Sequence, residues 1–118
     1  MTEYVRKKGT RESIEVAAGQ GTSMQVLIGS EEAPNFAFRK FVMEPHGGMP
    51  KHTNLVEHEQ YVLNGSGTVE IDNEVFEVSA GDAVYIPGNV SHSYKAGKDG
   101  FEFICVVPNK EDKIELLE

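Results

Sequence analysis

The amino-acid sequence predicts an all-β fold, a sandwich or a barrel, from three observations. Apolar residues alternate with polar ones instead of recurring at the three- and four-residue spacing of a helix. Gly and Pro interrupt the chain throughout, so that turn signals recur about every 8 to 12 residues, as in sandwiches and barrels. The length of 118 residues suits one domain rather than two.

The alternating segments define the strands expected along the chain. In order, they cover residues 24–28, 36–44, 50–54, 58–63, 68–71, 75–78, 83–86, 91–95 and 101–107. We expect hairpin turns at 64–67 (NGSG) and at Asp72-Asn73, because Gly, Asn and Asp tolerate the positive φ angles of tight turns. These two turns would join three strands into a meander.

We expect a single domain over 1–118, with the barrel at 24–108 between two polar ends. Residues 1–23 are predicted as an edge strand or a mobile arm. Residues 109–118 form a mostly charged tail, in which Ile114, Leu116 and Leu117 are the apolar anchors. Both ends are candidates for packing on a second subunit.

The net charge and the cysteine content exclude several classes of partner and of site. Eleven Lys and Arg against nineteen Asp and Glu give a net charge of −8, which disfavours nucleic acid and anionic membranes as partners. The longest apolar run, 103–107, is far shorter than the roughly 20 residues of a spanning helix, and no signal peptide is recognisable, so we expect a cytoplasmic protein. A single cysteine excludes an internal disulfide and a thiolate zinc cluster.

Three of the four histidines, His52, His58 and His92, lie inside expected strands. His52 and Asn54 are two residues apart and so face the same side of one strand. If these faces all line the interior of one barrel, three imidazoles converge. Imidazole nitrogen is the donor that divalent transition metals favour.

Two motifs in this region resemble those of the cupin superfamily. The first covers 50–54 (PKHTN) and 58–67 (HEQYVLNGSG), and the second covers 81–92 (GDAVYIPGNVSH). Together with their spacing they extend the resemblance over roughly residues 36–108. It implies a small single-domain cupin, whose fold is a double-stranded β-helix, a jelly-roll barrel.

The resemblance also implies a metal site, although two of its ligand positions depart from the usual cupin pattern. Cupins typically bind their metal through two His, one Glu and a final His, and the matching positions here are His52, Asn54, His58 and His92. This set is neutral, so a bound ion would keep its full charge and favour an anionic ligand. The ion would be Fe, Mn, Zn or Ni. The alternative is a metal-free barrel with hydrogen-bonded histidines.

Alternation along the expected strands makes further residues candidates for lining the pocket: Arg39, Gln60, Tyr94, Phe103 and Cys105. Arg39 and Lys40 must point to opposite faces, so an inward Arg39 would bind a carboxylate, whereas an edge strand would leave both in solvent. Cys105 would either approach the metal or simply be a small buried hydrophobe.

Two functions follow. The first is a metal-dependent enzyme of dioxygenase or oxidoreductase type that acts on a small carboxylated or oxygenated molecule. The second is a non-catalytic cupin that binds or senses a sugar or a small acid. Resemblance to other small cupins also implies a homodimer formed by exchanged N-terminal strands.

Overall fold

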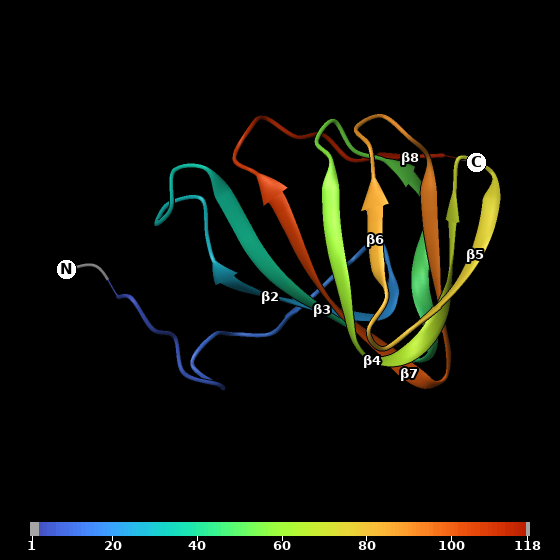
Figure 1. Ribbon diagram of the computed structural model, residues 1–118, viewed down its shortest axis with the longest axis horizontal. Helices are drawn as coiled ribbons and strands as arrows, with labels where there is room; N and C mark the ends of the chain where they lie inside the picture. The colour runs from blue at the N-terminus through green and yellow to red at the C-terminus, as the bar shows by residue number, and fades with distance from the viewer. Residues whose placement is uncertain (1–2, 118) are drawn as a thin grey trace.

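The structure, a computed structural model, describes residues 3–117. The expected arm begins at Met1 and the expected tail ends at Glu118, and residues 1, 2 and 118 lie outside this range. Among the described residues, no helix is long and apolar enough to cross a membrane. Strands provide the regular structure, as the alternating pattern predicts, and the all-β prediction is confirmed (Figure 1).

The described chain forms eight antiparallel strands. They are β1 (Ile14–Glu15), β2 (Gln20–Ile28), β3 (Phe36–Thr53), β4 (His58–Ile71), β5 (Glu74–Ser79), β6 (Ala83–Ile86), β7 (His92–Pro108) and β8 (Glu115–Leu116). Their order is β1-β2-β3-β7-β4-β5, while β6 also pairs with β4 and β8 with β3.

Three of these strands each join two of the segments expected from the sequence. Segments 36–44 and 50–54 both fall in β3 except for residue 54, segments 58–63 and 68–71 fall in β4, and segments 91–95 and 101–107 fall in β7 except for residue 91. The pairing of β3 with β7 shifts between Met43 and Gly48, and the pairing of β4 with β7 shifts between Val62 and Asn64. A bulge bends a strand without ending it. Each long strand therefore continues round the barrel.

The predicted hairpin turn at 64–67 is wrong for this reason, and so is the three-strand meander. Gly65 has the positive φ of 75° that a turn would need, but it lies inside β4 and pairs with Phe101 of β7. A Cβ at Gly65 would collide with the carbonyl of Gly100, so glycine here permits a close approach of two strands. The turn at Asp72-Asn73 is confirmed, with φ of 51° and 66° and Ile71 paired with Glu74.

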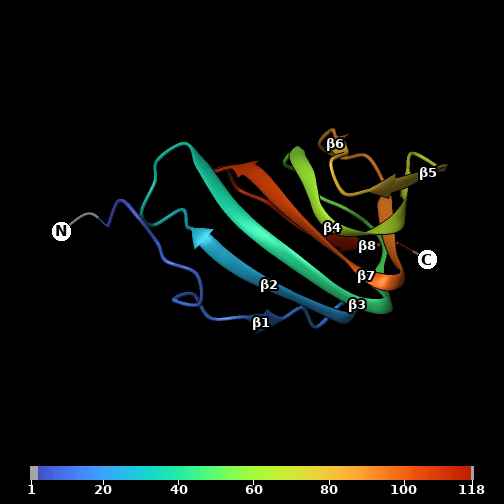
Figure 2. The same cartoon turned by 60° about the horizontal axis from the view of Figure 1, so that its bottom comes forward.

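The bends divide the strands into two facing sheets. In the first sheet, β2 and the first half of β3 pair beside the second half of β7, the first half of β4 and β6. In the second sheet, the second half of β3 pairs with the first half of β7, the second half of β4 and β5. Figure 2 shows β2, β3 and β7 side by side along the curved sheet.

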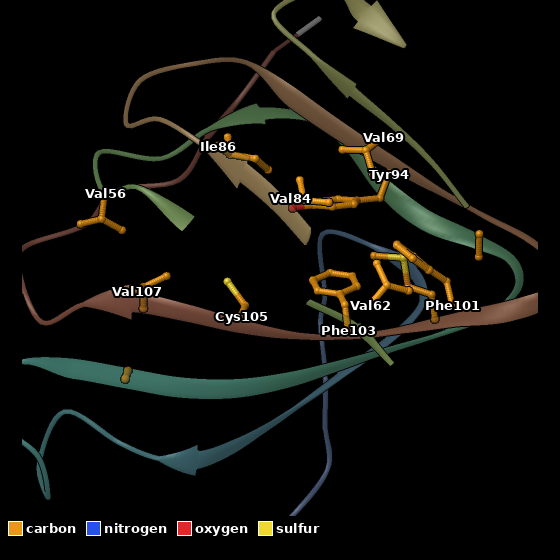
Figure 3. Close-up of a cluster of buried hydrophobic side chains, with 13 residues drawn as sticks. Val56, Val62, Val69, Val84, Ile86, Tyr94, Phe101, Phe103, Cys105 and Val107 are labelled. Atoms are coloured by element: carbon orange, nitrogen blue, oxygen red, sulfur yellow. The ribbon is translucent and has the colours of Figure 1, made fainter. Parts of the chain in front are cut away.

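The core fills the space between these sheets. Side chains alternate along the second half of β7, so that Phe103, Cys105 and Val107 are buried while Glu102, Ile104 and Val106 lie on the other face. Figure 3 shows Phe103, Cys105 and Val107 projecting from the same side of β7 into the cluster that contains Val62, Val84 and Ile86.

The C-terminal segment packs on its own chain. Beyond β7, the Asn109 amide donates to the Asn35 carbonyl at 3.0 Å, and β8 then pairs with β3 at His52 and Thr53. The segment thus crosses one end of the barrel between its two attachments (Figure 1).

Candidate functional site

A cavity of about 150 Å³ lies between the two sheets, at the end of the barrel that the C-terminal segment crosses. Of the residues singled out from the sequence, eight line it: Arg39, His52, Asn54, His58, Gln60, His92, Tyr94 and Phe103. Cys105 does not line the cavity but lies directly behind it. The cavity is smaller than the roughly 300–1,000 Å³ of pockets for drug-sized ligands, so it suits a small one.

His52 and His92 enter the cavity from the second sheet, as cross-strand partners on β3 and β7. Their ring centroids are 4.1 Å apart. Nδ1 of His52 lies 2.7 Å from the Pro50 carbonyl oxygen, and Nδ1 of His92 lies 3.0 Å from that of Val90. A carbonyl only accepts, so each Nδ1 carries the proton, and in the neutral ring Nε2 keeps its lone pair.

His58 enters from the opposite sheet, on β4. Its ring centroid is 5.7 Å from that of His92, and its Nδ1 contacts the Cys105 sulfur at 3.1 Å. The alternation of β4 places His58 and Gln60 inward and Glu59 outward. The strand faces expected from the sequence are therefore the ones observed.

Burial keeps two of these histidines neutral. It lowers the pKa of His58 to about 3, with a further contribution from the Arg39 guanidinium. It lowers the pKa of His92 to about 4, although the hydrogen bond to the Val90 carbonyl acts in the opposite direction. At neutral pH both rings are thus in the uncharged state that a metal ion binds.

Asn54 follows the end of β3 and is held by a residue that the sequence did not single out, Asp112. The Asn54 side chain donates from Nδ2 to Asp112 Oδ2 at 3.1 Å. The other carboxylate oxygen accepts from the amides of Leu55, at 2.8 Å, and Val56, at 3.3 Å. Partial burial raises the pKa of Asp112, but these hydrogen bonds outweigh it and the pKa lies below its usual value.

Arg39 points into the cavity, whereas its neighbour Lys40 points outward and pairs with Glu102 at 3.1 Å. The Arg39 guanidinium lies over the Phe41 ring at 5.2 Å, and its Nη2 donates to the Cys105 sulfur at 3.6 Å. Its Nε is buried with no hydrogen-bond partner, and among residues 3–117 the side chain forms no ion pair. A positive charge without a counterion therefore borders the cavity.

The remaining polar groups are engaged with one another. Gln60 Nε2 donates to the Tyr94 hydroxyl at 2.7 Å, and the Tyr94 ring stacks on Phe103 at 5.3 Å between centroids. Burial raises the pKa of the Tyr94 phenol and of the Cys105 thiol, so both are protonated at neutral pH.

The donor atoms in the cavity are of the types that bind divalent transition metals. Buried polar atoms are normally paired, yet Asn54 Oδ1, His58 Nε2 and His92 Nε2 are buried in this cavity without a hydrogen-bond partner among residues 3–117. Neutral imidazole nitrogen and amide oxygen are accepted ligands of such ions. No three His, Cys, Asp or Glu side chains of the described chain are already drawn together as a metal-binding group. The side chains would have to move closer to hold an ion.

Sequence reasoning missed Asp112 because nothing in the tail marks it. It is one of several charged residues there, and its role depends on how the segment returns to β3. The apolar wall of the cavity was also missed: it includes Val16, Met24, Met49 and Ile114. Val16 and Ile114 lie outside the segment expected to form the barrel.

Comparisons with known proteins agree with this architecture. A family model described as a cupin domain matches residues 39–107. The solved structure of the polyketide cyclase RemF from Streptomyces resistomycificus superimposes with a TM-score of 0.89 and 26% identity, over 100% of this chain and 87% of that chain.

Two curated relatives match over shorter regions. An uncharacterized protein of Methanocaldococcus jannaschii is 35% identical over 65 residues, which are 52% of each chain. The dimethylsulfoniopropionate lyase DddW of Ruegeria pomeroyi is 49% identical over 41 residues, which are 35% of this chain and 27% of the lyase. The matches thus span about half and about a quarter of these relatives. Since the cupin-domain match covers more than half of the chain and the whole fold agrees, the protein belongs to the cupin family.

Proposed function

We propose that this cupin holds a divalent transition metal through His52, His58 and His92, with Asn54 Oδ1 as a fourth ligand, and acts as an enzyme on a small anionic molecule. The observation that carries the proposal is the set of buried, unpaired donor atoms on Asn54, His58 and His92 around one cavity. Leaving such atoms unpaired costs free energy, which a bound ion would recover.

The charge of the cavity supports an anionic substrate. The proposed ligands are neutral, so Fe, Mn, Zn or Ni would bring two positive charges, and Arg39 adds a third beside Phe41. Arg presents a planar set of donors that matches a carboxylate. The carboxylate group of the substrate would pair with Arg39, and Phe41, Met43 and Phe103 would exclude water around it.

Oxidation by dioxygen is the reaction class that the lining residues support best. A bound ion would supply Lewis acidity and, for iron or manganese, access to oxidation by dioxygen. The chain itself offers few groups for acid–base chemistry: Asp112 already accepts three hydrogen bonds, and Tyr94 is a buried phenol with a raised pKa. The similarity to a lyase and a cyclase makes elimination and cyclisation the second reaction class to assay.

The test is a dioxygen-consumption screen on protein loaded with iron or manganese, using small 2-hydroxy and 2-oxo acids. We expect turnover that is lost in His58→Gln and weakened in Arg39→Gln through a higher KM. Lys40→Gln is the matched control, because Lys40 lies on the same strand but points outward. Equal turnover in the wild type and His58→Gln would refute the proposal.

A second function, ligand binding without catalysis, is favoured by one observation. Apart from Asp112, the described residues that line the cavity include no carboxylate that could serve as a general base. In that case the protein would bind a sugar or a small acid. Calorimetry distinguishes the two, because a pure binding protein would show saturable binding of an acid by the loaded protein with neither dioxygen uptake nor product.

A further inference from the structure

The C-terminal segment, residues 109–117, connects the two sheets across the mouth of the barrel (Figure 1). It leaves the first sheet at Asn109, whose side chain also donates from Nδ2 to the Ala33 carbonyl. It rejoins the second sheet where β8 pairs with His52 and Thr53 and where the Leu117 amide donates to the Lys51 carbonyl at 2.9 Å. One of the proposed ligands, His52, is therefore in the strand to which this segment is attached.

Asp112 lies midway along this segment and is the one acidic residue among the described residues that line the cavity. Its two carboxylate oxygens accept hydrogen bonds from different groups. Oδ1 accepts from the backbone amides of Leu55 and Val56, which fixes the carboxylate on the loop after β3. Oδ2 accepts from Asn54 Nδ2 at 3.1 Å.

This contact determines which end of the Asn54 amide remains free. A carboxylate only accepts hydrogen bonds, so the end that faces Asp112 must be the NH2 group. The oxygen then lies at the opposite end, and Oδ1 is the atom found buried without a partner in a side chain only 5% exposed. Rotating the amide by half a turn would place the acceptor against a carboxylate and the NH2 group, which cannot bind a metal, in the free position.

We propose that Asp112 is a positioning residue for the metal centre, which holds the Asn54 amide with its oxygen toward the cavity and so links docking of residues 109–117 to metal affinity. The inference rests on the proposed function, since it assigns the orientation of one of the proposed ligands. Outer residues that orient metal ligands typically contribute about 10- to 100-fold in affinity.

The sharpest test is Asp112→Asn. The side-chain oxygen introduced by this substitution can still accept from the amides of Leu55 and Val56, but the introduced NH2 group would then face Asn54. The Asn54 amide should turn to present its oxygen to that NH2 group, which preserves a hydrogen bond and withdraws the ligand from the cavity. We expect a loss of about 10- to 100-fold in the affinity for Co²⁺, measured by absorption titration of the full chain, with a nearly unchanged unfolding midpoint.

A swapped pair provides the rescue. In Asn54→Asp/Asp112→Asn, one oxygen of the new carboxylate accepts from the side-chain amide introduced at position 112, and the other faces the cavity whichever way the carboxylate turns. Co²⁺ affinity should return at least to the wild-type value. Glu111→Gln is the matched control, because it removes one charge from an exposed neighbouring position, and its affinity should stay within about twofold of the wild type.

A readout without metal separates this inference from the proposed function. In the metal-free protein, the Asn54 side-chain NH2 signals in a nitrogen–proton NMR spectrum should show protection from solvent exchange, which Asp112→Asn alters and Glu111→Gln does not. Wild-type protein that binds no Co²⁺ would overturn the proposed function, while these signals would still decide the orientation of Asn54. Unchanged Co²⁺ affinity in Asp112→Asn, or failure of the swapped pair to restore a lost affinity, would overturn the role of Asp112.

Discussion

Acidification should destabilise the metal-free protein, and His58 and His92 should account for a defined part of that loss. Burial lowers the pKa of His58 to about 3 and that of His92 to about 4, whereas in the unfolded chain both lie near about 6.5. As the pH falls below 6.5, the unfolded chain binds a proton at each ring and the folded chain does not. The free energy of unfolding therefore decreases from this pH downward, until the folded-state pKa is reached.

The size of the effect follows from these pKa values. At pH 5.5 each histidine is about one unit below its unfolded pKa, which corresponds to about 1.4 kcal/mol, whereas at pH 7.5 its contribution is close to zero. The two rings together should lower the free energy of unfolding by about 3 kcal/mol. For a domain of this size, such a change lowers Tm by on the order of 10 °C.

The assay is urea unfolding in the presence of a chelator at pH 7.5 and 5.5, for the wild type and for His58→Gln/His92→Gln. Other groups titrate in both proteins, so the difference between the two pH dependences isolates the two rings. We expect the variant to lose about 3 kcal/mol less than the wild type between these pH values. The same pH dependence in both proteins would refute the buried, neutral state of His58 and His92.

Three further predictions follow. Arg39→Gln should weaken the binding of small carboxylates to the metal-loaded protein by about tenfold or more without changing metal affinity, and equal carboxylate affinity in calorimetry would exclude an anion site at Arg39. Gly48→Ala should destabilise the fold by about 1–3 kcal/mol in urea unfolding, because the added Cβ would run into the carbonyl of Tyr94; a change below about 0.5 kcal/mol would mean that the strands can separate there. The homodimer expected from exchanged N-terminal strands should pair β1, which lies on β2 of its own chain in the structure, with β2 of a second copy. Light scattering should then report twice the 13.0 kDa chain mass for the wild type and a smaller mass for a chain shortened to residues 16–118, and a wild-type monomer would contradict the homodimer.

Local alternation predicted the part of the site that lies on regular strands. Because side chains alternate along a strand, the inward faces of His52, His58, Gln60 and His92 could be assigned from the sequence, and the structure places all four on the cavity. Alternation also shows that Arg39 and Lys40 point to opposite faces of the strand. Which of the two points inward, however, depends on the register of β3 with its neighbours. That register is a long-range property.

The sequence-based predictions were wrong or incomplete where the local sequence is compatible with more than one structure. A stretch such as 64–67 can form a hairpin turn or a bulge, since both use glycine with positive φ, and the partner strand decides between them. Asp112 could not be found at all, because its contact with Asn54 joins residues 58 positions apart and leaves no periodic pattern in the tail.

The most direct test of the central claim is elemental analysis of protein purified without a histidine tag and without added metal, together with His52→Ala/His92→Ala. Circular dichroism should show that both proteins are folded. We expect close to one transition-metal ion per chain in the wild type and its loss in the variant. A folded wild type that contains no transition metal and takes up none of added Fe, Mn, Zn or Ni would contradict the metal centre, and would leave a barrel that binds its ligand without metal.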